Sequence, residues 1–314
     1  MGIFDLIRLC LKFRESWCYT MEKHYRSKLS IFIFAFPGLL LFTVFTVYPI
    51  LPQVLISFQK HDGFNSSGWV GFDNYIKVLN SASFWRANGN TLIIVLISLF
   101  VALPLSLLLA LVIDVQTPKI RDFFKFASVF PAVLSVTVIS QMWVAIYEPQ
   151  WGLINSFLRF AGLESWTRQW LTDRGTVVIC IAIAFLWQYI GLNALLFYTG
   201  IKAIPKHYYE AAMIDGANFF KASFFITIPL LRDVIKYVLV LSVLGSMGMF
   251  AHIRVMTAGG PGDSSRSVIY QMYYTAFSTS EFGVGSTIAV LFIIECLLVT
   301  VLINKLTAKE RIEF

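Results

Sequence analysis

Six stretches of the chain are apolar over the length that a helix needs to cross a bilayer. A hydrocarbon core about 30 Å thick takes roughly 20 apolar residues of α-helix. The six stretches predict transmembrane helices near residues 31–57, 89–113, 123–147, 176–201, 230–252 and 284–304. The first contains three prolines, and we interpret it as one kinked span because neighbouring groups can satisfy the backbone that a proline leaves free. The predicted fold class is an all-α integral membrane protein.

Composition excludes several other classes of protein. The 314 residues are 57% hydrophobic and only 14% charged, whereas a soluble domain carries about a quarter charged residues. The net charge of +7 does not by itself indicate a nucleic-acid partner, and we expect none. The four cysteines and four histidines show neither CxxC spacing nor a Cys/His cluster. The sequence therefore predicts no disulfide framework and no metal site.

The distribution of Lys and Arg predicts which side of the membrane each loop occupies. Six spans would put both termini on one side. The segments on that side carry fifteen Lys and Arg residues, and the loops on the opposite side carry eight. By the positive-inside rule both termini are cytoplasmic. The surplus of positive charge then reflects topology, with a modest attraction to anionic headgroups.

The residues before the first span form a basic segment, residues 1–30. Within residues 3–19, apolar side chains recur at helical spacing with charged residues between them. This pattern predicts an amphipathic helix on the cytoplasmic surface of the membrane; a disordered basic tail is the alternative. Residues 31–306 would then be the transmembrane domain and residues 307–314 a cytoplasmic tail.

The loop between the fourth and fifth spans is less apolar than its surroundings. Its sequence, IPKHYYEAAMIDGANFFKASFFITIPLLRD, occupies residues 204–233. Pro205 suits a first helical position, and Gly216 supplies a stop because glycine can take the left-handed conformation that ends a helix. A second helix can follow from Ala217 to Ile228, and Pro229 marks a bend into the next span. The product is a short cytoplasmic helix whose small side chains let another protein approach closely.

This loop resembles the EAA loop of bacterial ABC-importer permeases, in which Glu-Ala-Ala, Asp-Gly-Ala and Ile-x-x-Pro follow one another at fixed spacing. The matching positions are Glu210, Ala211, Ala212, Asp215, Gly216, Ala217, Ile226 and Pro229. The resemblance implies that residues 204–229 contain a coupling helix. That helix, with Ile214 as a further member of its surface, would dock on a separate ATP-hydrolysing subunit.

The resemblance extends over nearly the whole chain from residue 31 and points to the carbohydrate branch, of the maltose-permease type. Residues 70–92, 151–163 and 257–286 are similar to segments of that branch. The resemblance implies a bacterial cell-membrane protein that pairs with a second, homologous permease. Its other partners would be a dimer of ATP-binding subunits, which hold ATP and Mg, and an extracytoplasmic binding protein that delivers a sugar. No catalytic residue and no cofactor is expected on this chain.

A sugar pathway needs hydrogen-bonding side chains and aromatic faces at membrane depth. The candidates in the third, fourth and fifth spans are Gln141, Tyr147, Gln188, Tyr189, Asn193 and Ser246. The alternative is hydrogen bonding between helices or an interfacial aromatic belt, which accounts for most such residues. Glu295 lies near the middle of the sixth span, where structural burial or pairing with the second permease competes with a role in transport.

Other functions and local interpretations remain open. An ion-coupled secondary transporter would want several paired intramembrane charges or matching broken helices, and Glu295 stands alone. Glycerol-phosphate solutes pass through relatives of similar pattern, but the spans carry no Lys or Arg at mid-depth, which favours a neutral sugar. The Gly-Gly-Pro-Gly element at 259–262 lacks the Gly-Lys-Ser/Thr of a phosphate loop, so it is predicted to be a turn. Gly283 and Gly285 are predicted to allow close contact between helices.

Overall fold

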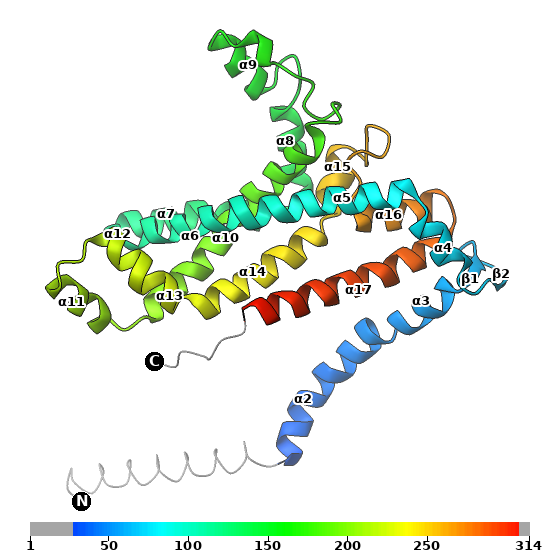
Figure 1. Ribbon diagram of the computed structural model, residues 1–314, viewed down its shortest axis with the longest axis horizontal. Coiled ribbons are helices and arrows are strands. Elements are labelled where there is room, and N and C mark those ends of the chain that lie inside the picture. Colours follow the sequence, from blue (N-terminus) through cyan, green and yellow to red (C-terminus); the bar gives the residue numbers. More distant parts are fainter. Residues whose placement is uncertain (1–27, 308–314) are drawn as a thin grey trace, which may run out of the picture. The chain divides into compact units, whose positions relative to one another are not determined.

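A computed structural model describes residues 28–307, and the predicted amphipathic helix at 3–19 lies outside them. The chain divides into two compact units, residues 1–55 and 56–314. Within the described part, the secondary structure is helical apart from one short hairpin, β1 (Gln59–His61) paired antiparallel with β2 (Ser66–Trp69). The all-α prediction is therefore confirmed for the architecture (Figure 1), and the hairpin is an addition that the sequence pattern did not predict.

From Lys28 onward, the first unit is one long apolar helical segment that continues to Ser57. It comprises α2 (Lys28–Phe42), a π-helical turn (Thr43–Val47) and α3 (Ile50–Ser57). Together they are long and apolar enough to cross a membrane as one segment, Ile31–Ser57, which confirms the prediction of a single span interrupted by prolines. In the π-helical turn, the N–H of Tyr48 bonds the carbonyl of Thr43 at 2.8 Å. The proline-rich stretch is thus accommodated by local unwinding of the helix.

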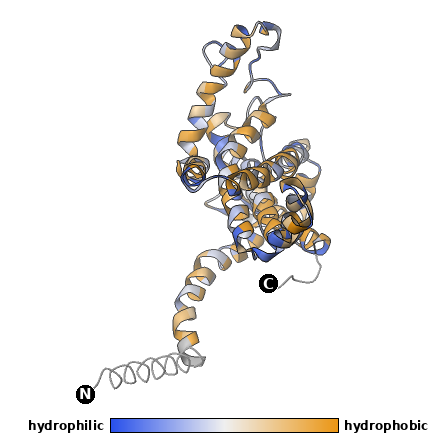
Figure 2. Cartoon of the chain, turned by 90° about the vertical axis from the view of Figure 1, so that its left-hand side faces the viewer, coloured by the Kyte–Doolittle hydropathy of each residue, from blue (hydrophilic) through white to orange (hydrophobic). Residues whose placement is uncertain are grey.

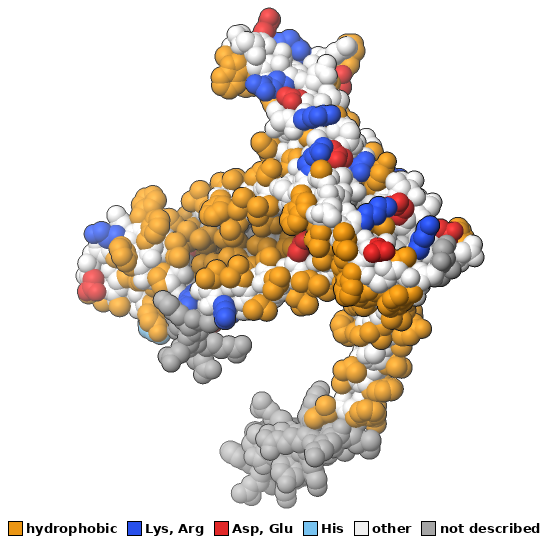
Figure 3. Space-filling view, turned by 45° about the vertical axis from the view of Figure 1, so that its right-hand side comes forward, with side chains coloured by type: hydrophobic (Ala, Val, Ile, Leu, Met, Phe, Trp, Pro, Cys, Tyr) orange, Lys and Arg blue, Asp and Glu red, His pale blue; other side chains and the backbone are white. Residues whose placement is uncertain are grey.

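Four further helical segments of the second unit can cross a membrane by length and composition: Ala82–Asp114, Val177–Ala203, Arg232–Met256 and Phe282–Leu306. Their elements are α5 (Ala82–Ile97), η2 (Ser98–Ala102), α6 (Leu103–Asp114), α10 (Val177–Ala203), α14 (Arg232–Met247), α15 (Ala251–Met256) and α17 (Phe282–Leu306). They correspond to four of the predicted spans. The helices are coloured mainly as apolar in Figure 2, and Figure 3 shows a broad apolar surface between more charged ends.

The third predicted span is strongly bent. It consists of α7 (Pro118–Val133) and α8 (Val136–Ile146), which meet at 96°. Pro131 cannot donate a backbone hydrogen bond within α7. The two residues that link α7 to α8, Leu134 and Ser135, have extended ψ values of 149° and 135°. Residues 28–307 therefore contain five candidate spans, or six if this pair counts as one, and six remains a prediction.

Shorter elements connect these helices. They are α4 (Asp73–Leu79), α9 (Leu153–Phe160), η3 (Glu164–Trp166), α11 (His207–Ile214), α12 (Phe219–Ala222), η4 (Ser223–Thr227), α13 (Ile228–Leu230), α16 (Val268–Tyr273) and η5 (Tyr274–Ser278). Figure 1 shows α11–α13 at one end of the second unit, which we call the loop end, and α4 with the β1–β2 hairpin at the other, the hairpin end.

Helix α10 forms the centre of the second unit. Its side chains contribute to two hydrophobic clusters, one with α6 and α14 toward the loop end and one with α15 toward the hairpin end. Gly191 permits a very close crossing of α10 and α7, because a β-carbon at this position would lie 1.7 Å from the carbonyl oxygen of Ser128. The packing of the two helices therefore depends on the absence of a side chain there.

Two glycines at the start of α17 lie in close contact with other elements. A β-carbon on Gly283 would lie 2.1 Å from the carbonyl oxygen of Gln59, and one on Gly285 would lie 2.8 Å from the β-carbon of Ala276. Asn74 reinforces the first contact by donating from Nδ2 to the carbonyl of Gln59 at 2.9 Å. Gly285 brings α17 against the helical turn η5, which confirms the predicted contact between helices, whereas Gly283 brings α17 against the β1–β2 hairpin and not against a helix.

Candidate functional site

Helix α11 presents two different faces. Ala212 is buried and Tyr209 half-buried, whereas Glu210, Ala211 and Ile214 point away from the neighbouring helices and are exposed. Ile214 is 87% exposed. Residues three apart lie on the same side of a helix, so Tyr209 and Ala212 form the inner face. The exposed face combines one carboxylate with small and apolar side chains, a composition suited to a protein partner.

The end of α11 is a Schellman motif. Gly216 has φ +74°, its N–H bonds the carbonyl of Met213 at 3.1 Å, and the N–H of Ala217 bonds the carbonyl of Ala212 at 2.9 Å. This pair of bonds is the pattern expected when a left-handed glycine follows the last helical residues. The predicted stop at Asp215-Gly216 is confirmed.

The flanks of α11 differ in detail from the predicted boundaries. The helix begins at His207 rather than at Pro205. The next helix begins at Phe219 rather than at Ala217, because Asn218 is extended and its side chain accepts a hydrogen bond from the N–H of Lys221. Side chains of this kind cap a helix from the residue before it. Pro229 lies at the start of the short α13, and the interruption before α14 falls at Leu231.

Two of the predicted pathway residues line one cavity. Tyr189 and Asn193, one turn apart on α10, face a space of about 240 Å³ between α10, α14 and the residues around Ser98. Asn193 donates from Nδ2 to the hydroxyl of Ser242 at 3.1 Å, and Ser242 also lines the cavity. The lining residues, all within the part of the chain that the structure describes, include no charged side chain. Hydroxyl, amide and aromatic groups of this kind can contact a polar, uncharged solute.

The other predicted pathway residues lie elsewhere. Gln188 is 1% exposed and hydrogen-bonded to His252 at 2.9 Å. Tyr147 is buried and donates to the carbonyl of Cys180 at 3.2 Å. Ser246 donates to the carbonyl of Ser242 at 2.6 Å, and Gln141 is exposed on α8. In this conformation three of these side chains have hydrogen-bond partners within the protein, namely Gln188, Tyr147 and Ser246. This agrees with the alternative to a pathway role, in which such residues form hydrogen bonds between or within helices.

Glu295 projects from the middle of α17 and is half-buried. The structure records no hydrogen bond and no ion pair between its carboxyl group and another described residue. Within residues 28–307, Glu295 is therefore not connected to another charged group, as a charge relay would require. In the same range, no group of three His, Cys, Asp or Glu side chains could hold a metal ion.

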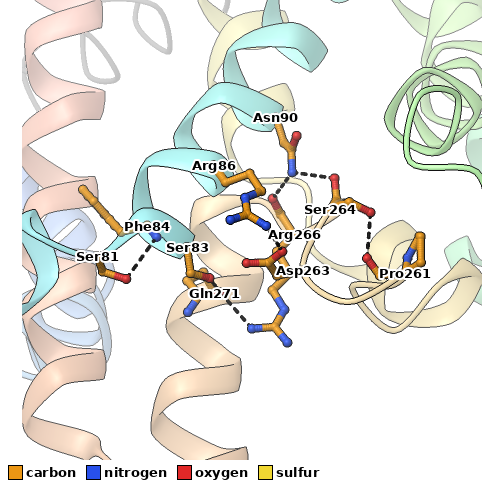
Figure 4. A network of polar contacts seen from close by, with 10 residues as sticks. All are labelled: Ser81, Ser83, Phe84, Arg86, Asn90, Pro261, Asp263, Ser264, Arg266 and Gln271. Carbon is orange, nitrogen blue, oxygen red and sulfur yellow. Dashed lines mark hydrogen bonds and ion pairs between the residues drawn. The ribbon is translucent and has the colours of Figure 1, made fainter.

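At the hairpin end, α5 holds the loop between α15 and α16 (Figure 4). Asn90 donates from Nδ2 to the carbonyls of Ser264 at 2.8 Å and Arg266 at 2.9 Å. Arg86 forms an ion pair with Asp263 at 2.5 Å. Asn90 lies in the segment 70–92 that resembles the family, a resemblance that assigns it no role, and nothing in the sequence pairs Arg86 with a residue so far along the chain. These contacts fix a largely half-buried loop against a membrane helix.

The Gly-Gly-Pro-Gly element within that loop is a turn, as predicted. Gly259 and Gly262 have positive φ values of +82° and +65°. The N–H of Gly260 bonds the carbonyl of Thr257 at 2.9 Å, and the N–H of Ser264 bonds the carbonyl of Pro261 at 3.2 Å. Such bonds close successive tight turns.

Residues 95–311 match the family described as the binding-protein-dependent transport system inner membrane component. The chain belongs to this family. It is a multi-pass membrane protein and an ABC transporter permease, a transport subunit. Among curated relatives, the probable ABC transporter permease protein YurN of Bacillus subtilis is 31% identical over 289 residues, covering 91% of this chain and 99% of YurN. The arabinooligosaccharides transport system permease protein AraP of the same organism is 33% identical over 285 residues, covering 90% of each chain.

A solved structure shows the same fold for the permease. A chain of a bacterial ABC transporter involved in the import of the acidic polysaccharide alginate superposes with a TM-score of 0.78 at 20% identity, covering 96% of this chain and 98% of that one. The trehalose/maltose transport system permease protein MalF of Thermococcus litoralis is a further relative, 28% identical over 287 residues, with 91% of this chain and 96% of MalF covered.

Proposed function

We propose that this permease forms, with a second homologous permease, the pathway for a neutral sugar or oligosaccharide, and that α11 couples the pathway to ATP hydrolysis on separate subunits. The exposed face of α11 carries the proposal. It displays Glu210, Ala211 and Ile214 on a helix that ends in a Schellman motif. A short helix that presents such a face beyond the membrane spans suits docking into a groove of a partner.

The sugar class rests on two independent observations. Relatives carry names such as arabinooligosaccharides transport system and trehalose/maltose transport system permease proteins. The cavity beside Tyr189 and Asn193 is lined mostly by apolar side chains, with a few uncharged polar groups and no charged residue among them, whereas a phosphorylated or acidic solute would favour Lys or Arg. We therefore favour a neutral sugar over a glycerol-phosphate solute.

The orientation follows from the charges. The loop end carries Lys119, Arg121, Lys202, Lys206 and Lys221, and the positive-inside rule assigns this end to the cytoplasm. ATP and Mg would be bound there by the partner ATPase subunits. The hairpin end, with the loop that Asn90 holds, would then face the extracytoplasmic binding protein that delivers the solute.

In this mechanism the chain transmits motion and performs no chemistry. Closure of the ATPase dimer on ATP would displace α11, and α10 and α14, which flank the loop, would move with it. The cavity beside Tyr189 would open alternately to the two sides of the membrane. ATP can shift this equilibrium only by the difference in its affinity for the two states of the assembly.

Uptake measurements test the function directly. Cells that contain the whole transport system should accumulate a labelled neutral oligosaccharide, and cells lacking only this chain should not. Uptake should stop on depletion of ATP and continue when an ionophore collapses the ion gradients. Uptake that follows the ion gradient would favour a secondary transporter, and uptake restricted to a glycerophosphodiester would overturn the sugar assignment.

A further inference from the structure

A side-chain hydrogen bond joins α11 to the segment that follows it. The phenol oxygen of Tyr209, on the inner face of α11, lies 3.1 Å from the hydroxyl oxygen of Thr227. Thr227 belongs to the π-helical turn η4 and is 3% exposed. The bond therefore connects two elements that the chain itself joins only through the turn around Gly216.

The direction of this bond follows from a second contact. The hydroxyl of Thr227 donates to the carbonyl of Ala222 at 3.4 Å. A hydroxyl has one proton, so the phenol of Tyr209 donates and Thr227 accepts. Burial raises the pKa of the Tyr209 phenol, which keeps the donor protonated at physiological pH.

The ring of Tyr209 also reaches the helical bundle. It packs against the hydrophobic cluster toward the loop end, which includes Ile201 and Ile204 at the end of α10 and Leu231 just before α14. Leu231 in turn is connected to Thr227, because its N–H bonds the carbonyl of Thr227 at 2.9 Å. One side chain of α11 thus packs against a cluster to which the ends of both long helices contribute.

We propose that Tyr209 and Thr227 act as a strut that holds α11 rigidly on α10 and α14, so that a displacement of α11 moves both helices. They are positioning residues, and the inference rests on the proposed coupling function. Without the strut, α11 remains attached by the short connections on either side of it, 204–206 and 215–218. Part of the displacement would then be lost as local tilting of α11.

Isosteric variants test the strut from both sides. Tyr209→Phe removes only the phenol oxygen, Thr227→Val replaces the hydroxyl by a methyl group, and Thr227→Ser keeps the hydroxyl. The complete importer, reconstituted in liposomes with its binding protein, gives the number of ATP molecules hydrolysed per solute molecule imported. We expect this ratio to rise about fivefold in Tyr209→Phe and in Thr227→Val, because each variant loses one buried hydrogen bond. The ratio should stay near the wild-type value in Thr227→Ser.

The double variant sharpens the test. If both residues act through one bond, Tyr209→Phe combined with Thr227→Val should be no worse than either single change. Additive effects, or unchanged ratios in both single variants, would overturn the strut. A second measurement does not depend on assembly with the ATPase: the rate of hydrogen exchange at the α11 amides of the permease in nanodiscs. Exchange should accelerate in both variants, and unchanged exchange would likewise overturn the proposal.

Failure of the strut and failure of the coupling function give different results. If the strut is absent but coupling is real, the variants bind the ATPase and import solute at the wild-type ratio. If the coupling function is wrong, the wild-type permease itself does not recover an ATPase subunit.

Discussion

Replacing Gly216 with valine is expected to reduce solute import per ATP hydrolysed at least about tenfold while the permease remains folded in the membrane. The φ of Gly216 is +74°, a conformation that costs a residue with a β-carbon about 1–2 kcal/mol and a β-branched residue more. A β-carbon at this position would meet nothing within 4 Å. The substitution therefore strains the backbone where α11 ends and does not disturb the hydrophobic core.

Import and binding-protein-stimulated ATPase activity in liposomes would measure this effect. Gly216→Asn is the matched control, because asparagine tolerates the left-handed conformation better than other residues; it should retain most of the coupling. Wild-type import and ATPase activity in Gly216→Val would contradict the role assigned to the Schellman motif of α11.

Replacing Gly191 with alanine is expected to destabilise the permease itself. The added β-carbon would lie 1.7 Å from the carbonyl oxygen of Ser128, and the obstacle is backbone that cannot rotate away. Helices α7 and α10 would have to separate, and overpacking of this kind costs about 3 kcal/mol or more. We expect a strong loss of the folded protein in membranes and a lower midpoint in thermal unfolding of the detergent-solubilised chain.

Gly245→Ala provides the comparison within the same bundle. A β-carbon on Gly245 of α14 would come no closer than 4.0 Å to Phe185, which is ordinary contact, so this variant should unfold like the wild type. Equal thermal midpoints for Gly191→Ala and Gly245→Ala would show that the close crossing of α7 and α10 is not needed for the fold.

The sequence predicted the features that depend on local composition. Long apolar runs located the membrane helices because the bilayer requires them, and the Asp-Gly pair located the stop of α11 because glycine pays no steric cost there. The next helix begins two residues after the predicted start at Ala217, because the side chain of Asn218 caps it.

Features that depend on distant partners could not be predicted. The 96° bend between α7 and α8 involves a stretch that is apolar throughout, so its composition resembles that of a straight span. Gln188 is predicted as a pathway residue because it is polar and at membrane depth, but it is hydrogen-bonded to His252, which lies 64 positions further along the chain. By contrast, Tyr189 and Asn193 line the same cavity for a local reason, because residues four apart lie on one face of a helix.

The most direct test of coupling is a pull-down of the permease in mild detergent, with the wild type and Glu210→Lys compared side by side. Glu210 is exposed on the outer face of α11, so reversing its charge should disturb a partner without disturbing the fold. The coupling function predicts that the wild type recovers a second permease and an ATPase subunit, and that the variant loses only the ATPase. Recovery of the permease alone from wild-type cells in which transport is intact would contradict it.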